Sequence, residues 1–213
     1  MAEVKTEGRV QRRQKRNRAA LIAAARAVMA EKGVDAATML EIADRADVGA
    51  GTVYNYFKSK EELAVAVLET LMHELGVRIE SVTDTFDDPA QVYAFGIRKV
   101  LDTATTDPRW EQMLNRTEVM ADAMFRVMGP FAIRDLRLAS QANRFRVSNP
   151  ELVWRLTTQA IIGASFAITK GEIPAAAKNQ IITRLLCMTG IDLDGASELA
   201  ARPLPDLPAL PKN

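Results

Sequence analysis

The sequence is poor in the residues that build enzyme, metal and disulfide sites. Its 213 residues include one cysteine, Cys187, and one histidine, His73. A single cysteine cannot close a disulfide within the chain, and the short Cys and His spacings of zinc sites are lacking. A histidine-dependent triad would rest on His73 alone, and no phosphate-binding glycine motif is present. We therefore expect no catalytic residues, no metal and no cofactor, and a reducing cytoplasm as the location.

Long apolar runs are also missing. A first helix is expected from about Arg16 to Lys32, stopped by Gly33. Outside it, the longest apolar run covers residues 160–168, far fewer than the ~20 residues needed to span a bilayer. Aromatic residues make up only 6% of the chain, whereas hydrophobic residues make up 48% and charged residues 26%. This balance predicts a globular protein with one or two apolar cores and no membrane segment.

The net charge of +1 hides an uneven distribution. Residues 1–60 contain 12 Lys and Arg against 7 Asp and Glu, whereas the remaining residues contain 16 against 20. This opposed balance indicates that the N-terminal part meets a polyanion. Within it, Arg12, Arg13 and Arg16 belong to a basic arm that can follow phosphates or enter a minor groove. For residues 1–10, a solvated disordered tail is the alternative.

Residues 38–60 carry the most specific pattern in the chain. Residues 38–41 have the spacing of a capping box, which predicts that a helix starts there. Residues 47–49 predict a tight turn, and a second short helix follows over about 50–57. Residues 59–62 form a second capping box, which opens a further helix. Two short helices joined by a tight turn are typical of a helix-turn-helix DNA reader.

This pattern resembles the DNA-binding signature of the TetR family of bacterial transcriptional regulators. The match covers about residues 16–65, and the residues that carry it are Thr38, Ile42-Ala43, Ala46-Asp47-Val48, Gly51-Thr52-Val53-Tyr54-Asn55-Tyr56-Phe57 and Ser59-Lys60-Glu61. The resemblance implies an all-α fold, with an N-terminal three-helix DNA-binding domain and a larger C-terminal helical domain for effector binding and dimerisation. It also implies a homodimer, and a two-fold protein reads a palindromic operator.

Two positions depart from the family pattern and affect where bases are read. Asp47 stands where the turn usually has glycine, and Leu40 stands where the first helix often has a polar side chain. We therefore expect the second helix to read the bases, with Asn55 as the main candidate because asparagine pairs bidentately with adenine. By resemblance and charge, Thr38, Tyr56 and Lys60 are expected to hold phosphates. The full set of expected DNA-binding residues is Arg12, Arg13, Arg16, Thr38, Ala50, Gly51, Thr52, Tyr54, Asn55, Tyr56 and Lys60.

Beyond residue 60 the sequence predicts one helix after another and no alternating strand pattern. The expected helices cover about residues 60–83, 89–105, 108–117, 118–128, 130–146, 150–169 and 174–189. From Pro203 the chain carries four prolines in nine residues, which predicts an extended or disordered tail. Four parts are therefore expected: a basic arm (1–15), a helix-turn-helix domain (16–60), a ligand-binding and dimerisation domain (61–195) and a proline-rich tail (196–213).

The last two long helices of this region are the expected dimer interface. Small residues at helical spacing form a strip that lets another helix approach closely. By resemblance to the family, these two helices pair with their symmetry mates. The expected interface residues are Ala160, Gly163, Ala164 and Ala167 on the first helix and Ile181, Ile182, Leu185 and Met188 on the second. Ordinary packing within one chain is the alternative.

A run of soft and aromatic residues is the expected effector site. Methionine fills irregular apolar space, which suits a pocket for an apolar or amphiphilic small molecule and equally suits an ordinary core. The expected ligand-binding residues are Trp110, Met113, Met120, Met124, Phe125, Met128 and Phe131. The arginines Arg134, Arg137, Arg144 and Arg146 could meet an anionic end of a ligand, or form a solvated basic face.

Together these patterns predict a ligand-responsive DNA-binding transcriptional regulator, most often a repressor in this family. A DNA-binding regulator without a small-molecule effector is the alternative. A small all-α enzyme is the least favoured alternative.

Overall fold

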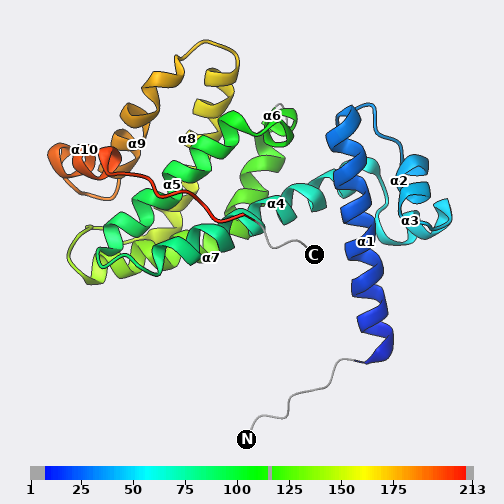
Figure 1. Cartoon of the computed structure of the whole chain (residues 1–213). Helices are drawn as coiled ribbons and strands as arrows, with labels where there is room; N and C mark the ends of the chain where they lie inside the picture. The colour runs from blue at the N-terminus through cyan, green and yellow to red at the C-terminus, as the bar shows by residue number, and fades with distance from the viewer. Residues whose placement is uncertain (1–7, 115–116, 210–213) are drawn as a thin grey trace, which may run out of the picture. The chain divides into compact units, whose positions relative to one another are not determined.

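The computed structural model describes residues 8–114 and 117–209, without the side chains of residues 113, 114 and 117 (Figure 1). The described residues form helices and connecting segments and contain no strand, so the predicted all-α class is confirmed. The helices are α1 (Arg9–Lys32), α2 (Met39–Arg45), α3 (Ala50–Tyr56), α4 (Lys60–Thr83), α5 (Pro89–Thr106), α6 (Pro108–Leu114), α7 (Thr117–Gln141), α8 (Pro150–Thr169), the 3₁₀ turn η1 (Ala175–Ala177), α9 (Lys178–Cys187) and α10 (Leu193–Ala201). No described helix is both long and apolar enough to cross a membrane.

The chain divides into two compact units, and the boundary falls inside α4, between Leu68 and Glu69. In the first unit, α1 packs on α2, and α2 packs on α3. Buried residues recur along α1 at helical spacing and meet buried residues of the two short helices. The core of this unit includes Leu21, Ala25, Val28, Ile42, Ala43, Val53, Phe57 and Leu63.

In the second unit α5 is the central helix. It contacts α6, α7, α8, α9 and α10, and its buried residues include Tyr93, Ile97 and Leu101 (Figure 1). Helices α5 and α8, which begin at prolines, start where the sequence predicts, and a side chain caps each of them. Asp88 accepts a hydrogen bond from the N–H of Ala90 at the start of α5, and Asn149 accepts one from Leu152 at the start of α8.

Two helix boundaries in the first 150 residues differ clearly from the sequence prediction. Helix α1 begins at Arg9, so much of the expected basic arm is helical. Helix α7 continues through Gly129-Pro130, where a break was expected. Proline removes one N–H and disfavours the helix interior, but buried residues on both sides hold α7 in the second unit. Whether a helix continues through a proline at such a position therefore depends on tertiary packing.

The C-terminal region also differs from the prediction. One helix was expected over residues 174–189, but the chain forms η1 and the shorter α9 there. A further helix, α10, was not expected and overlaps the start of the predicted tail. Asp192 caps α10 by accepting a hydrogen bond from the N–H of Gly195 at 2.8 Å, and Leu199 is 1% exposed. The described residues after α10 form no helix, which agrees with an extended tail from Pro203.

Candidate nucleic-acid interface and effector cavity

The first helix of the helix-turn-helix is fixed by the predicted capping box. The hydroxyl of Thr38 accepts the N–H of Glu41 at 3.3 Å, and the Glu41 carboxylate accepts the N–H of Thr38 at 3.1 Å. Lys32 also donates to Glu41. The hydrogen bonds from Lys32 and Thr38 lower the pKa of Glu41, so this exposed carboxyl stays ionised. Thr38 itself is exposed, and its hydroxyl also donates to the Glu41 carboxylate at 3.0 Å.

The turn between α2 and α3 explains one departure from the family pattern. Asp47 has φ 53°, in the left-handed region that favours glycine, and aspartate tolerates this conformation better than most residues. The N–H of Val48 then donates to the carbonyl of Ala43 at 3.0 Å and closes the turn. Asp47 therefore occupies the special backbone position that glycine usually takes.

One face of α3 is anchored and the other is open. Val53 is fully buried and Phe57, just after the helix, is 1% exposed. On the opposite face Tyr54 is 54% exposed, and Gly51 and Asn55 are also exposed. The remaining predicted residues on this helix, Ala50, Thr52 and Tyr56, are half-buried. Helix α3 therefore presents side chains to the outside along one face, as a helix that enters a DNA groove must.

The second capping box forms, but its return bond reaches a different residue. The hydroxyl of Ser59 accepts the N–H of Glu62 at 3.2 Å, while the carboxylate of Glu62 accepts the N–H of Lys58 at 2.7 Å. Lys60 begins α4, and its ammonium group donates to the carbonyl oxygen of Asp35 at 2.5 Å. This bond positions the Lys60 charge and leaves two further N–H donors.

The predicted basic residues lie on the N-terminal turns of α1. Arg12, Arg13 and Arg16 are all exposed. Arg12 and Arg16 line a surface hollow together with Arg9 and Lys15. The expected DNA-binding residues thus all lie in the first unit, on α1, on α3 and at the starts of α2 and α4.

The predicted dimer strip on α8 is largely uncovered in the single chain. Gly163 is exposed, and a Cβ placed on it would meet no described atom within 4 Å. Ala160, Ala164 and Ala167 are half-buried. The same helix also exposes two leucines that the sequence reasoning missed, with Leu152 53% and Leu156 49% exposed. These two leucines extend the exposed strip towards the start of α8.

The predicted interface residues on α9 divide into two groups. Met188 is 37% exposed and Ile181 is half-buried, so both remain available to a partner. Ile182 and Leu185 are 1% and 5% exposed, and the single chain already buries them. These two residues belong to the core of the second unit, in which α9 packs against α5, α8 and α10.

The predicted effector residues are also divided. Trp110 is 1% exposed, and Met120 and Met124 are fully buried. Phe125 is half-buried, with the guanidinium of Arg155 3.7 Å from its ring centroid. The side chain of Met113 lies outside the described residues. Of the predicted set, Met128 and Phe131 line a cavity.

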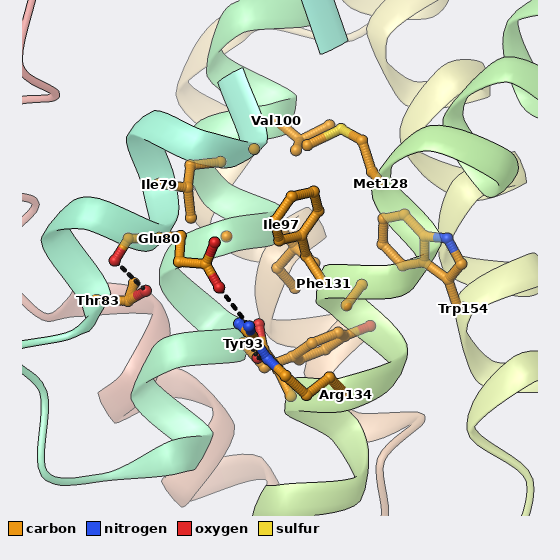
Figure 2. Close-up of a pocket in the computed structure, with 14 residues that line it drawn as sticks. Ile79, Glu80, Thr83, Tyr93, Ile97, Val100, Met128, Phe131, Arg134 and Trp154 are labelled. Atoms are coloured by element: carbon orange, nitrogen blue, oxygen red, sulfur yellow. Dashed lines mark hydrogen bonds and ion pairs between the residues drawn. The ribbon is translucent and has the colours of Figure 1, made fainter. Parts of the chain in front are cut away.

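This cavity lies among α4, α5, α7 and α8 and has a volume of about 30 Å³ (Figure 2). Its larger apolar side chains are Ile79, Ile97, Val100, Met128, Phe131 and Trp154. Its polar side chains are Glu80, Thr83, Tyr93, Arg134 and Asp135. Figure 2 shows Val100 and Met128 at one end and Tyr93 and Arg134 at the other. Sequence reasoning missed most of these residues because they come from four helices and form no local pattern.

The polar end of the cavity carries more carboxylates than cations. Arg134 donates to both Glu80 and Asp135, and its Nη2 atom lies 2.9 Å from Oδ1 of Asp135. Asp135 is 8% exposed, and burial raises its pKa. The hydroxyl of Tyr93 lies 3.1 Å from that of Thr157, and burial also raises the pKa of Tyr93. An anionic ligand group would face these carboxylates.

The arginines suggested for an anionic ligand have other partners. Arg134 is neutralised by the two carboxylates of the cavity. Arg137 pairs with Glu151, and Arg144 pairs with Asp88. Arg146 is exposed. Arg137, Arg144 and Arg146 therefore fit the alternative of a solvated basic face. Of the four arginines, Arg134 is the one that lines the cavity.

Comparison with known proteins identifies the class. Residues 21–67 match the family described as bacterial regulatory proteins, tetR family, and residues 88–202 match the tetracyclin repressor-like C-terminal domain. The structure resembles the crystal structure of RolR in complex with resorcinol, with a TM-score of 0.83 and 32% identity, over 94% of this chain and 100% of the other. The structure of RolR without ligand gives a TM-score of 0.80 at 32% identity, over 89% and 100% of the two chains.

A sequence relative gives a shorter match. The HTH-type transcriptional repressor KstR of Mycobacterium tuberculosis (strain ATCC 25618 / H37Rv) is 30% identical over 110 residues, which are 52% of this chain and 50% of KstR. The chain thus spans about half the length of the curated relatives it matches. The helix-turn-helix and the helical second unit define a DNA-binding transcriptional regulator. This chain belongs to the tetR family of bacterial regulatory proteins.

Proposed function

We propose that this protein is a homodimeric repressor that binds a palindromic operator and is released from it by a small amphiphilic molecule. The observation that carries the proposal is that one chain has both an exposed face on the second helix of the helix-turn-helix and a cavity among the helices of the second unit. Repression, as opposed to activation, is supported by the similarity to KstR, which is named as a transcriptional repressor.

In the DNA-binding step, α3 reads bases and the residues around it hold phosphates. Tyr54 and Asn55 are exposed on α3 and reach base edges, while the backbone at Gly51 approaches the groove. Thr38 and Lys60 begin the neighbouring helices and hold the sugar–phosphate backbone. Two copies related by a two-fold axis then require half-sites about 34–36 Å apart.

Dimerisation uses the exposed strip on α8. Ala160, Gly163 and Ala167 let a partner helix approach closely, and Leu152 and Leu156 supply apolar area at one end. Ile181 and Met188 of α9 add to the interface, whereas Ile182 and Leu185 stabilise the subunit from inside.

The cavity favours an effector with an apolar ring and an uncharged polar end. The ring would contact Ile97, Val100 and Met128, while a hydroxyl group would donate to Glu80 or Asp135. A carboxylate group would be repelled there, because Arg134 is already paired. RolR, which is similar over most of this chain, was crystallised with resorcinol, a ring with two hydroxyls.

Binding of a ring requires the cavity to open. A volume of about 30 Å³ holds one or two water molecules, whereas benzene has been found in a cavity of about 150 Å³. Phe131 is the side chain that has to move, because its half-buried ring lines the cavity and fits against Gly76 of α4. A Cβ on Gly76 would lie only 2.9 Å from Cε2 of Phe131, so this contact leaves no spare room.

Opening at Phe131 would reach the DNA through α4. Helix α4 has residues in both compact units, and it begins directly after the helix-turn-helix. A ligand releases the protein from DNA only to the extent that it binds more tightly to a conformation in which the spacing of the two recognition helices does not match the operator half-sites. A 100-fold loss of operator affinity requires about 2.7 kcal/mol of such preference, and operator DNA must weaken ligand binding by the same factor.

Thermal shift measurements on the full chain test the effector class. Resorcinol and phenol are expected to raise the melting temperature and to release operator DNA, whereas benzoate, a ring with a carboxylate, is not. At 100 times the dissociation constant the stabilisation is about 2.7 kcal/mol, or about 5–11 °C for a chain of this size.

Two variants test the polar end. Glu80→Gln and Asp135→Asn are expected to weaken the resorcinol shift. Glu69→Gln is the matched control, because Glu69 lies on the same helix, pairs with Arg126 and does not line the cavity. Equal shifts with resorcinol and benzoate, or equal losses in all three variants, would show that the polar end does not select the ligand.

A regulator without a small-molecule effector is the second candidate, and the small volume of the cavity is the observation that favours it. It predicts that neither resorcinol nor phenol changes the melting temperature or operator affinity of the wild-type chain.

A further inference from the structure

A groove beside the recognition helix is lined entirely by hydrogen-bond donors. It lies between the N-terminal turns of α1 and the end of α3 and has a volume of about 490 Å³. Its lining residues are Gln11, Gln14, Lys15, Arg18, Asn55 and Tyr56. Each of these side chains can donate a hydrogen bond, and no carboxylate is among them. The chemistry of the groove therefore suits an anionic partner with many acceptor oxygens.

The groove exists because α1 starts early. Gln11, Gln14, Lys15 and Arg18 follow the spacing i, i+3, i+4, i+7, which places them on one helical face. The helix is already regular at Gln11, whose side-chain oxygen accepts the N–H of the N-cap Gly8 at 3.3 Å and leaves the amide NH₂ free to turn outward. In an unfolded arm these four side chains would share no surface.

Arg18 ties this face to α3. Its guanidinium carbon lies 5.0 Å from the ring centroid of Phe57, the buried residue that follows α3. The stack fixes one cation beside Asn55 and Tyr56, while Lys15 supplies a second positive charge one helical turn away. Two of the side chains that line the groove, Lys15 and Arg18, are therefore cationic.

We propose that this groove holds a stretch of the operator's phosphodiester backbone, next to the base pairs that α3 reads. The inference rests on the proposed DNA binding and adds contacts from Gln11, Gln14, Lys15 and Arg18. The neighbouring side of α1, with Arg12 and Arg16, contributes attraction at longer range. A phosphate held on the groove side fixes how deeply α3 sits in the major groove.

The salt dependence of DNA binding tests Lys15. The probe is a duplex that the wild-type full chain recovers from a randomised library. Lys15→Gln is expected to lower the slope of log K against log salt by about 0.9 per subunit, or about 1.8 per dimer. The wild-type advantage over the variant should then shrink about 12-fold between 50 and 200 mM salt. Lys99→Gln is the control, since it removes the same charge from α5 in the second unit.

Two further measurements separate contact from general attraction. A series of duplexes carries one uncharged methylphosphonate per half-site, at successive positions. At one or two neighbouring positions the methylphosphonate should weaken wild-type binding and leave Lys15→Gln unaffected, because that contact is already lost. Gln11→Ala combined with Gln14→Ala should lower affinity about tenfold without changing the salt slope.

The outcomes are distinguishable. An unchanged slope for Lys15→Gln, or methylphosphonates that weaken both proteins equally at every position, would overturn the groove while DNA binding stands. If the variant with both Gln11→Ala and Gln14→Ala binds DNA with unchanged affinity, these two side chains of α1 do not contact the phosphodiester backbone. If the wild-type chain recovers no sequence and its binding shows no salt dependence, the proposed function fails together with the groove.

Discussion

Replacing Gly163 by leucine should stabilise the single chain and disrupt the dimer. Within the chain a new side chain at this position meets no described atom within 4 Å, so the fold accepts it. Glycine in a helix interior costs about 0.5–1 kcal/mol relative to a good helix former, and the variant regains this amount. At a close helix–helix contact the same side chain overpacks the interface, at about 1–3 kcal/mol per site.

A two-fold interface contains the substitution twice, so the penalty is about 2–6 kcal/mol per dimer. This weakens dimerisation by about 30-fold to about 10⁴-fold. Sedimentation equilibrium should show the 23.4 kDa chain in place of a species of twice that mass. Operator affinity should fall with it, because a monomer engages one half-site.

Gly163→Ala is the matched control. It gains nearly the same helix propensity but adds only one methyl group, so the dimer should be much less affected. A Gly163→Leu dimer as stable as the wild-type one would refute the reasoning and place the interface away from this strip. A monomer with lowered melting temperature would show that Gly163 matters inside the chain instead.

Other residues give independent tests. Asn55→Ala should lose about 1–3 kcal/mol of discrimination at one A·T pair per half-site; an unchanged base preference in a randomised-site selection would remove Asn55 from base reading. Lys60→Ala should weaken binding to all sequences alike and lower the salt slope by about 1 per subunit, and a wild-type slope would exclude the contact. Trp110→Ala should cost about 3–5 kcal/mol of stability because its side chain is core, measurable by urea unfolding; a much smaller loss would contradict that role. Burial raises the folded-state pKa of Asp135 above its usual 3.8, so just above pH 3.8 the folded chain binds a proton that the unfolded chain has lost. The free energy of unfolding therefore falls as the pH rises through this window. Asp135→Asn should flatten this part of the plot of unfolding free energy against pH, and an unchanged plot would show that Asp135 does not titrate there.

Short-range interactions, which can be read from the sequence alone, determine the structure of the helix-turn-helix. The capping box at Thr38, the turn at Asp47 and the helix after it each depend on residues a few positions apart. Such interactions act within one or two helical turns, so the sequence alone predicts where α2 and α3 begin. The same holds for the starts of α5 and α8.

Only the tertiary structure decided what depends on distant residues. Pro130 reads as a break, but packing on both sides keeps α7 continuous. Ile182 was expected at the dimer interface, but the single chain already buries it, and α9 packs there on α5, α8 and α10, of which the sequence did not predict α10. The methionine run forms a stripe in sequence, yet the cavity takes only Met128 and Phe131 from the predicted set, because its walls come from four helices far apart in the chain. A helix's own periodicity shows which face is apolar, but whether a neighbour, a ligand or a second subunit covers that face depends on how the helices pack.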